Sequence, residues 1–255
     1  MKIRILGCSG GIGAGLRTTS LLIDDDILLD AGSGVGDLSH AEMGHIKHIF
    51  LTHSHLDHHA FIPLLVDSIF ERLVGEPIVV HAHPDTIEML RRHIFNWAIW
   101  PDFTELPNRE QGVLRFQPML PGEVTVIQGR ELEMIPVNHI VPSVGYRVAS
   151  GQAAFAFSGD TGANDTFWQA LNAHQGLDLL IVETAFANRQ KDLAALSKHY
   201  CPATLAEDLA KLRHEPEVYL THLKPGEEMA ILSEVRVAIQ RFELKALVGG
   251  EVFQL

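Results

Sequence analysis

Four potential metal ligands lie within six residues, directly after an apolar stretch. Residues 53–58 read HSHLDH, and they follow the apolar run IFL at 49–51. In an extended chain His53 and His55 project to the same side, whereas Asp57 and His58 fall where the chain turns into the next predicted helix. The two pairs can therefore face two different ions. The ordinary alternative is a chance cluster on a polar loop, but the position at the end of a buried strand favours a metal site.

Three further candidates follow predicted strands later in the chain. His139 follows residues 134–138, Asp160 lies in FSGDTG at 157–162, and His222 follows residues 218–221. Taken singly, the two histidines are ordinary loop residues and Asp160 is a helix cap or turn residue. Taken together, the seven ligands divide into His53, His55 and His139 for one ion and Asp57, His58 and His222 for another, with Asp160 as a bridge.

This set of imidazoles and carboxylates suits two divalent metal ions. Without cysteine ligands the set favours Zn²⁺ and also tolerates manganese or iron. Two cations about 3.5–4 Å apart make hydroxide from water at neutral pH and offset the charge on a transferring phosphorus. The pattern therefore predicts a dinuclear metal site of the kind that can activate water for hydrolysis. We expect Asp30 to orient a ligand histidine from behind, with a structural turn residue as the alternative.

Apolar runs and turn signals predict the elements that position these residues. Strands are predicted at 2–6, 19–23, 27–30, 48–52, 78–81, 131–138, 144–149, 154–158, 179–183 and 218–220, and helices at 37–43, 58–73, 85–95, 165–173 and 202–211. The order of elements in the first half recurs in the second. We therefore predict an α/β (α+β) fold, a four-layer αβ/βα sandwich of two mixed β-sheets flanked by helices. Because no linker or repeat interrupts the chain, we expect one domain over residues 1–255.

The glycine-rich stretch at 7–15, GCSGGIGAG, is a candidate phosphate-binding loop. Its glycines do not match G-x-G-x-x-G, no GK[ST] follows, and the next residues alternate like a strand. We therefore interpret it as a turn or loop that needs open backbone geometry.

Composition limits the partners and the compartment. The formal net charge of −12 over 255 residues disfavours nucleic acid as a partner. Cys8 and Cys201 have no CxxC partner and are interpreted as reduced thiols. No apolar run reaches the ~18 residues of a membrane span, and the N-terminus has no apolar region typical of a signal peptide, so we expect no membrane association and a cytoplasmic location.

At residues 53–58, the chain resembles the metallo-β-lactamase superfamily. The H-x-H-x-D-H motif of that superfamily is matched by residues 53–58, and LLDAG at 28–32 and FSGDT at 157–161 are similar to further superfamily segments. The resemblance covers nearly the whole chain and implies the metallo-β-lactamase fold. Within the superfamily the chain is most similar to the class II cyclic nucleotide phosphodiesterases, through THSHLDH at 52–58, HIFNWAIWPDF at 93–103, SKH at 197–199 and THLKP at 221–225. One departure is HAF at 59–61, where a small glycine-containing stretch is common.

The resemblance implies hydrolysis of 3′,5′-cyclic nucleotides, cAMP or cGMP, to 5′-monophosphates, so the expected partner is a small cyclic nucleotide. Glu183 and His199 resemble a Glu/His pair of the tRNA 3′-processing branch, and with Asp57 they are the expected catalytic residues; a strand-end cap and a helix-start residue are the ordinary alternatives for the pair. Trp97, Trp100 and Phe103 either pack a helix end in the core or stack on a purine.

Other functions stay open at this stage. An RNA-processing, RNase Z-like phosphodiesterase is disfavoured by the acidic net charge and the lack of a long basic arm. A thioester or lactam hydrolase would not need Glu183 or His199. A nucleotide-binding sensor without turnover would have no use for an intact ligand set. The sequence leaves open the base preference, the metal used in the cell and whether the chain forms a homodimer.

Overall fold

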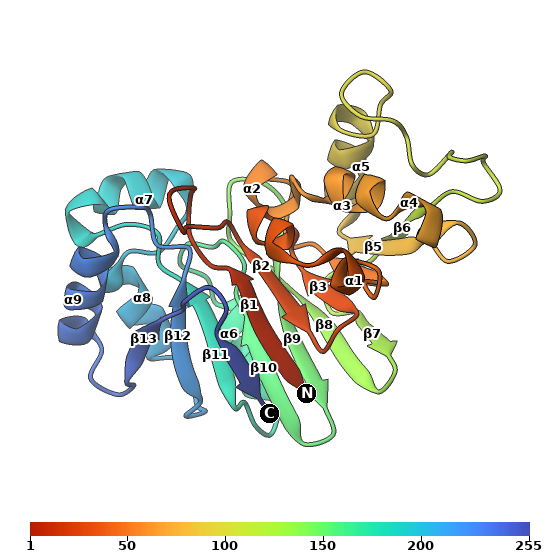
Figure 1. Ribbon diagram of the computed structural model, residues 1–255. Coiled ribbons are helices and arrows are strands. Elements are labelled where there is room, and N and C mark those ends of the chain that lie inside the picture. Colours follow the sequence, from red (N-terminus) through yellow and green to blue (C-terminus); the bar gives the residue numbers. More distant parts are fainter.

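The computed structural model describes residues 1–255 as two β-sheets packed against each other, with helices on both outer faces (Figure 1). One buried apolar cluster joins the two sheets and includes Ile5 and Phe50 from the first and Tyr146 and Phe155 from the second. Each sheet also has one buried apolar cluster between it and the helices that cover it. The predicted four-layer αβ/βα sandwich is therefore confirmed.

The two sheets have the same internal plan. The first has the order β14-β1-β2-β3-β4-β5-β6, with β1 (Lys2–Gly7), β2 (Ser20–Ile23), β3 (Ile27–Leu29), β4 (His48–Phe50), β5 (Ile78–Ala82), β6 (Leu114–Pro118) and β14 (Val252–Gln254). The second has the order β13-β12-β11-β10-β9-β8-β7, with β7 (Val124–Ile127), β8 (Arg130–Val137), β9 (Ser143–Ser150), β10 (Ala153–Phe157), β11 (Leu179–Glu183), β12 (Glu217–Thr221) and β13 (Leu244–Ala246). Each sheet begins antiparallel and continues with parallel pairs, from β3 to β6 and from β10 to β13. The carboxyl ends of the parallel strands thus share an edge in each sheet.

Helices cover the outer faces and none has the length and apolar character that crossing a membrane requires. The first half of the chain contributes α1 (His40–Met43), α2 (Leu56–His59), α3 (Ile62–Ser68), α4 (Phe70–Leu73) and α5 (Pro84–His93), and the second contributes α6 (Thr166–Ala173), α7 (Lys191–Ser197), α8 (Pro202–Leu209) and α9 (Glu228–Ala238). Two short 3-10 turns, η1 (Ser33–Asp37) and η2 (Asn188–Gln190), precede α1 and α7.

The predicted continuous helix at 58–73 is wrong, because the chain breaks there into α2, α3 and α4. The carbonyl oxygen of His58 accepts a hydrogen bond from the amide of Ala31 at 2.6 Å, and the amide of Phe61 donates to the carbonyl of Ala31 at 3.0 Å. The carbonyl of His58 and the amide of Phe61 therefore cannot form the hydrogen bonds that would continue the helix. Pro63 lies in the first turn of α3, where its missing N–H costs nothing. The break keeps α2 to a single turn at the end of β4.

Candidate metal centre

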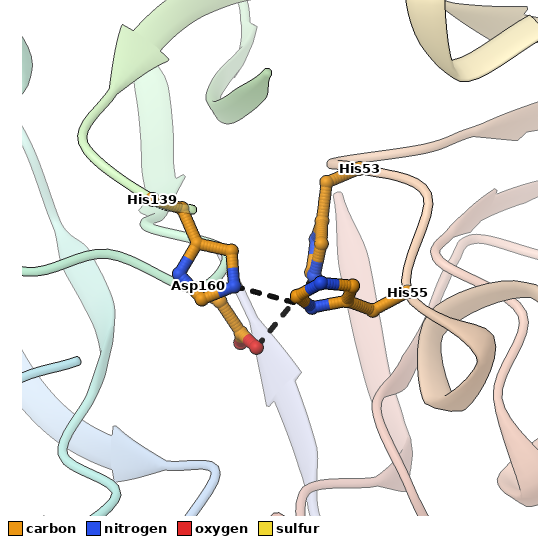
Figure 2. A group of neighbouring side chains, drawn as sticks. All are labelled: His53, His55, His139 and Asp160. Carbon is orange, nitrogen blue, oxygen red and sulfur yellow. Dashed lines mark hydrogen bonds and ion pairs between the residues drawn. The ribbon is translucent and has the colours of Figure 1, made fainter. Parts of the chain in front are cut away.

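All seven predicted ligands lie at the strand ends where the two sheets meet. His53 and His55 follow β4, Asp57 and His58 lie in α2, and the other three follow strands of the second sheet. The structure brings them into two groups, in each of which the ligand atoms lie within 4.8 Å of one another. The first group is His53, His55, His139 and Asp160 (Figure 2), and the second is Asp57, His58 and His222.

Asp160 lies between the two groups. Its Oδ2 is 3.7 Å from Nε2 of His53 and 3.3 Å from Nε2 of His58. Its Oδ1 is 3.3 Å from Nδ1 of His222. One carboxylate thus faces ligand nitrogens of both groups, which is the arrangement that a bridging ligand needs.

The chemistry of the buried atoms fits divalent cations. Nε2 of His53 and Nε2 of His58 are buried and have no hydrogen-bond partner, which is costly for a polar atom unless another ligand completes its environment. Burial lowers the pKa of His139 to about 4 and that of His222 to about 3. Both rings are therefore neutral near pH 7 and keep the lone pair that a metal ligand requires. The cluster is capable of binding metal through nitrogen and oxygen atoms.

Asp30 holds His58 from behind, as expected from the sequence. Oδ2 of Asp30 lies 2.7 Å from Nδ1 of His58, and both residues are fully buried. The backbone amide and the hydroxyl of Thr52 each donate to the Asp30 carboxylate at 2.8 Å. Because Nδ1 of His58 is engaged, its Nε2 is the nitrogen that points to the centre.

Lys198 contacts the candidate ligand His139, and sequence analysis missed this contact. Nδ1 of His139 donates to the carbonyl oxygen of Lys198 at 3.0 Å, and Nζ of Lys198 donates to the carbonyl oxygen of His139 at 3.0 Å. Lys198 ends α7 in the left-handed conformation, with φ of 52°. No local sequence pattern predicts this contact, because the two residues are 59 positions apart in the chain.

The glycine-rich stretch is a loop, as predicted, and it packs against the backbone of His222. His222 has a positive φ of 61°, a conformation that needs outside support in a residue other than glycine. Its amide donates to the carbonyl of Cys8 at 2.7 Å, and the amide of Gly10 donates to Leu223 at 3.0 Å. A Cβ at Gly10 would overlap the carbonyl oxygen of His222. The glycine thus permits the close approach that holds this candidate ligand.

We expect Gly10→Ala to weaken metal binding by about 10–100-fold, the usual effect of disturbing the support of a ligand. The new methyl group must displace the backbone of His222, whereas the fold of both sheets is untouched. Competition with a chromogenic chelator measures the affinity. Gly176→Ala is the matched control, because a Cβ there meets open space. Equal zinc affinity of the two variants would contradict this role of the loop.

Glu183 and His199 form a hydrogen-bonded pair beside the ligands. Nδ1 of His199 lies 2.6 Å from Oε1 of Glu183, which ends β11 and is fully buried. The Glu183 carboxylate also accepts from the amides of Thr161 at 2.9 Å and Ala185 at 3.0 Å. The His199 ring stacks on that of His222, with centroids 5.3 Å apart. Glu183 therefore holds the His199 ring through Nδ1. His199 also forms a third group of potential ligands with Asp160 and His222, whose ligand atoms lie within 4.8 Å of one another.

The three aromatic residues after α5 have different environments. Phe103 is buried in the core beneath the helices of the first sheet, and Trp100 packs against the same cluster. Trp97 is 59% exposed and has a φ of 65°. Core packing therefore accounts for Phe103 and for much of Trp100, but not for Trp97.

The chain is similar to known proteins. The sequence profile described as Beta-lactamase superfamily domain matches residues 26–240. The chain is 29% identical to a probable 3′,5′-cyclic-nucleotide phosphodiesterase of Yersinia pestis, over 88% of this chain and 78% of the relative. It is 27% identical to a ribonuclease Z of Bradyrhizobium sp. (strain ORS 278), over 82% of this chain and 84% of the relative. The crystal structure of unliganded yeast PDE1 matches with a TM-score of 0.85 and 20% identity, over 100% of this chain and 99% of that chain.

Proposed function

Because the chain belongs to the β-lactamase superfamily, we propose that it is a dinuclear, metal-dependent phosphodiesterase that hydrolyses 3′,5′-cyclic nucleotides to 5′-monophosphates. The main support is the placement of one carboxylate, Asp160, between two ligand groups, with the Glu183–His199 pair beside them. The similarity to a probable cyclic nucleotide phosphodiesterase over most of both chains favours the same substrate class.

The residues divide between two cations as follows. His53, His55 and His139 would hold one ion, Asp57, His58 and His222 would hold the other, and Asp160 would contact both. Nitrogen and carboxylate ligands without sulfur favour zinc and also suit manganese or iron. Two bound cations would supply an activated water and offset the negative charge of the phosphodiester.

The side chains around the cluster orient the reacting groups. Asp30 and Lys198 hold His58 and His139 in place through the hydrogen bonds described above. His199 is held by Glu183 at Nδ1, so its Nε2 is available to the phosphate. There it would contact a non-bridging oxygen and donate a hydrogen bond or a proton to the departing 3′-oxygen.

An RNA-processing phosphodiesterase is the second candidate, because ribonuclease Z relatives align over most of the chain. The net charge of −12 argues against it, since binding of a long polyanion depends on cationic contacts. A thioester or lactam hydrolase would make no use of the His199 position, and a sensor without turnover would make no use of two complete ligand groups.

Steady-state assays decide between these functions. We expect the protein to hydrolyse cAMP or cGMP well, to accept an aryl phosphodiester as a surrogate, and to leave pre-tRNA nearly unprocessed. Bound metal is quantified in the same sample, so that a metal-free preparation is not mistaken for an inactive enzyme. Efficient processing of pre-tRNA without turnover of either cyclic nucleotide would show that the protein is an RNA-processing phosphodiesterase instead.

A further inference from the structure

We propose that the cavity between α5 and the loop after β8 receives the nucleobase, and that Glu88 at this cavity selects a base with an exocyclic amine. The inference rests on the proposed function, since it places the part of a cyclic nucleotide that lies away from the reacting phosphate.

The cavity has a volume of about 320 Å³ and lies beside the ligand loop. Ser54, which stands between His53 and His55 in the chain, forms part of its lining. Met89 of α5 and Val141 and Pro142 of the loop after β8 contribute apolar surface. Apolar walls beside a few polar groups suit a flat base with a polar edge, and the volume is at the small end of ligand sites. The cavity therefore suits one nucleoside rather than a polynucleotide.

The charge of the lining supports the same conclusion. Asp85 and Glu88 are its ionisable residues, and no lysine or arginine lines it. A second phosphate would be repelled there. Oδ2 of Asp85 lies 3.6 Å from Nδ1 of His83, whereas the carboxylate of Glu88, an exposed residue of α5, makes no hydrogen bond or ion pair within the chain. Glu88 is thus the lining carboxylate that is free to bind a ligand.

An ionised carboxylate only accepts hydrogen bonds, so it selects an edge with donors. Guanine offers two adjacent donors, the ring N–H and the exocyclic amine, and a carboxylate can accept both at once. Adenine and cytosine offer an amine beside a ring acceptor. Uracil offers one N–H between two carbonyl oxygens, which a carboxylate repels. We therefore expect the order guanine, then adenine, then uracil.

Two neighbouring cavities are less suitable for a base. One of about 190 Å³ lies beside His199 and is lined by Lys191 and Lys198, so its size and charge suit an anion. Another of about 350 Å³ shares Val141 and Pro142 with the proposed site, but no carboxylate side chain lines it. Of these three cavities, the one beside Ser54 combines apolar walls with an unpaired carboxylate.

The test compares Glu88→Ala with the wild type on 3′,5′-cyclic GMP, 3′,5′-cyclic UMP and bis(p-nitrophenyl) phosphate, all with the metal-loaded protein. Loss of a charged hydrogen-bond acceptor should lower the cGMP-to-cUMP ratio of kcat/KM about tenfold. The aryl ester has no base, so its kcat/KM should stay unchanged. Glu71→Ala, an exposed glutamate on α4 that does not line the cavity, is the matched control. Met89→Ala should lower kcat/KM for both nucleotides several-fold, again without affecting the aryl ester.

A second readout is independent of turnover. Calorimetric titration should show tighter binding of 5′-GMP than of 5′-UMP to the wild type, and the difference should disappear in Glu88→Ala. If the wild type hydrolyses cyclic nucleotides but Glu88→Ala keeps their ratio and this difference in binding, the inference is wrong and the proposed function stands. If the wild type hydrolyses no cyclic nucleotide, the proposed function fails and the inference falls with it. An equal loss on the aryl ester would also overturn the base site.

Discussion

Asp160→Ala should reduce bound metal from about two ions per chain to at most one and should lower turnover of an aryl phosphodiester about 10³-fold or more. The carboxylate faces nitrogens of three histidines, His53, His58 and His222, at 3.3–3.7 Å. Its removal takes one ligand from each ion at once. It also deletes the carboxylate that faces ligand nitrogens of both groups.

Elemental analysis of metal, combined with initial rates, measures both effects. Asp160→Asn preserves the shape of the side chain but not its charge, so a similar loss in this variant shows that the defect is not simply a packing void. Asp67→Ala, at an exposed position on α3, is the control. A fully active wild type that holds one ion per chain at saturation would refute the dinuclear mechanism, and so would an Asp160→Ala variant that keeps two ions and full activity.

His199→Ala should lower turnover of a cyclic nucleotide by about 10² to 10⁴-fold while two metal ions remain bound. The reason is the leaving group. A 3′-alkoxide departs poorly and gains from a hydrogen bond or a proton, which His199 can supply because Glu183 holds its Nδ1 at 2.6 Å. A nitrophenyl phosphodiester has a good leaving group and should therefore lose much less activity.

The ratio of the two losses distinguishes the roles of His199. Equal losses on both substrates would indicate phosphate binding alone, and wild-type rates on both would return His199 to a structural role. Glu183→Gln, which weakens the support of the ring, should show the same preference for the good leaving group with a smaller loss. His174→Ala is the matched control, since His174 pairs with Glu133 at 2.7 Å in a histidine–glutamate pair outside the cluster.

The sheet architecture was predictable because most of its strands are apolar runs bounded by turns. Strands such as β11 and β12 bury nearly every residue, so their sequences are distinctive. Four strands, β6, β7, β13 and β14, were not predicted. Exposed residues interrupt the apolar pattern of β6 and β7, and β13 and β14 have three residues each. These strands form because each pairs with a neighbour: β6 with β5, β7 with β8, β13 with β12 and β14 with β1. Their own sequences do not indicate this pairing.

Helices were less predictable where tertiary hydrogen bonds compete with the helical ones. The break after α2 depends on Ala31, which takes the carbonyl of His58 and the amide of Phe61 out of the helix. Two helices, α7 and α9, were also not predicted. Neither has a side-chain cap at its N-terminus, so the usual start signal is absent.

The sequence by itself determined the local part of the site. The spacing of residues 53–58 and the position of the other candidates after predicted strands were sufficient to propose seven ligands in two groups with Asp160 between them, since a strand end defines which residues face the sheet edge. The tertiary structure decided what lies behind and around them. The contact of Lys198 with His139, the support of His222 by Gly10, and the cavity with Glu88 each join segments that are distant in the chain or belong to different elements. Such contacts depend on how the sheets and loops pack, and no local periodicity encodes them.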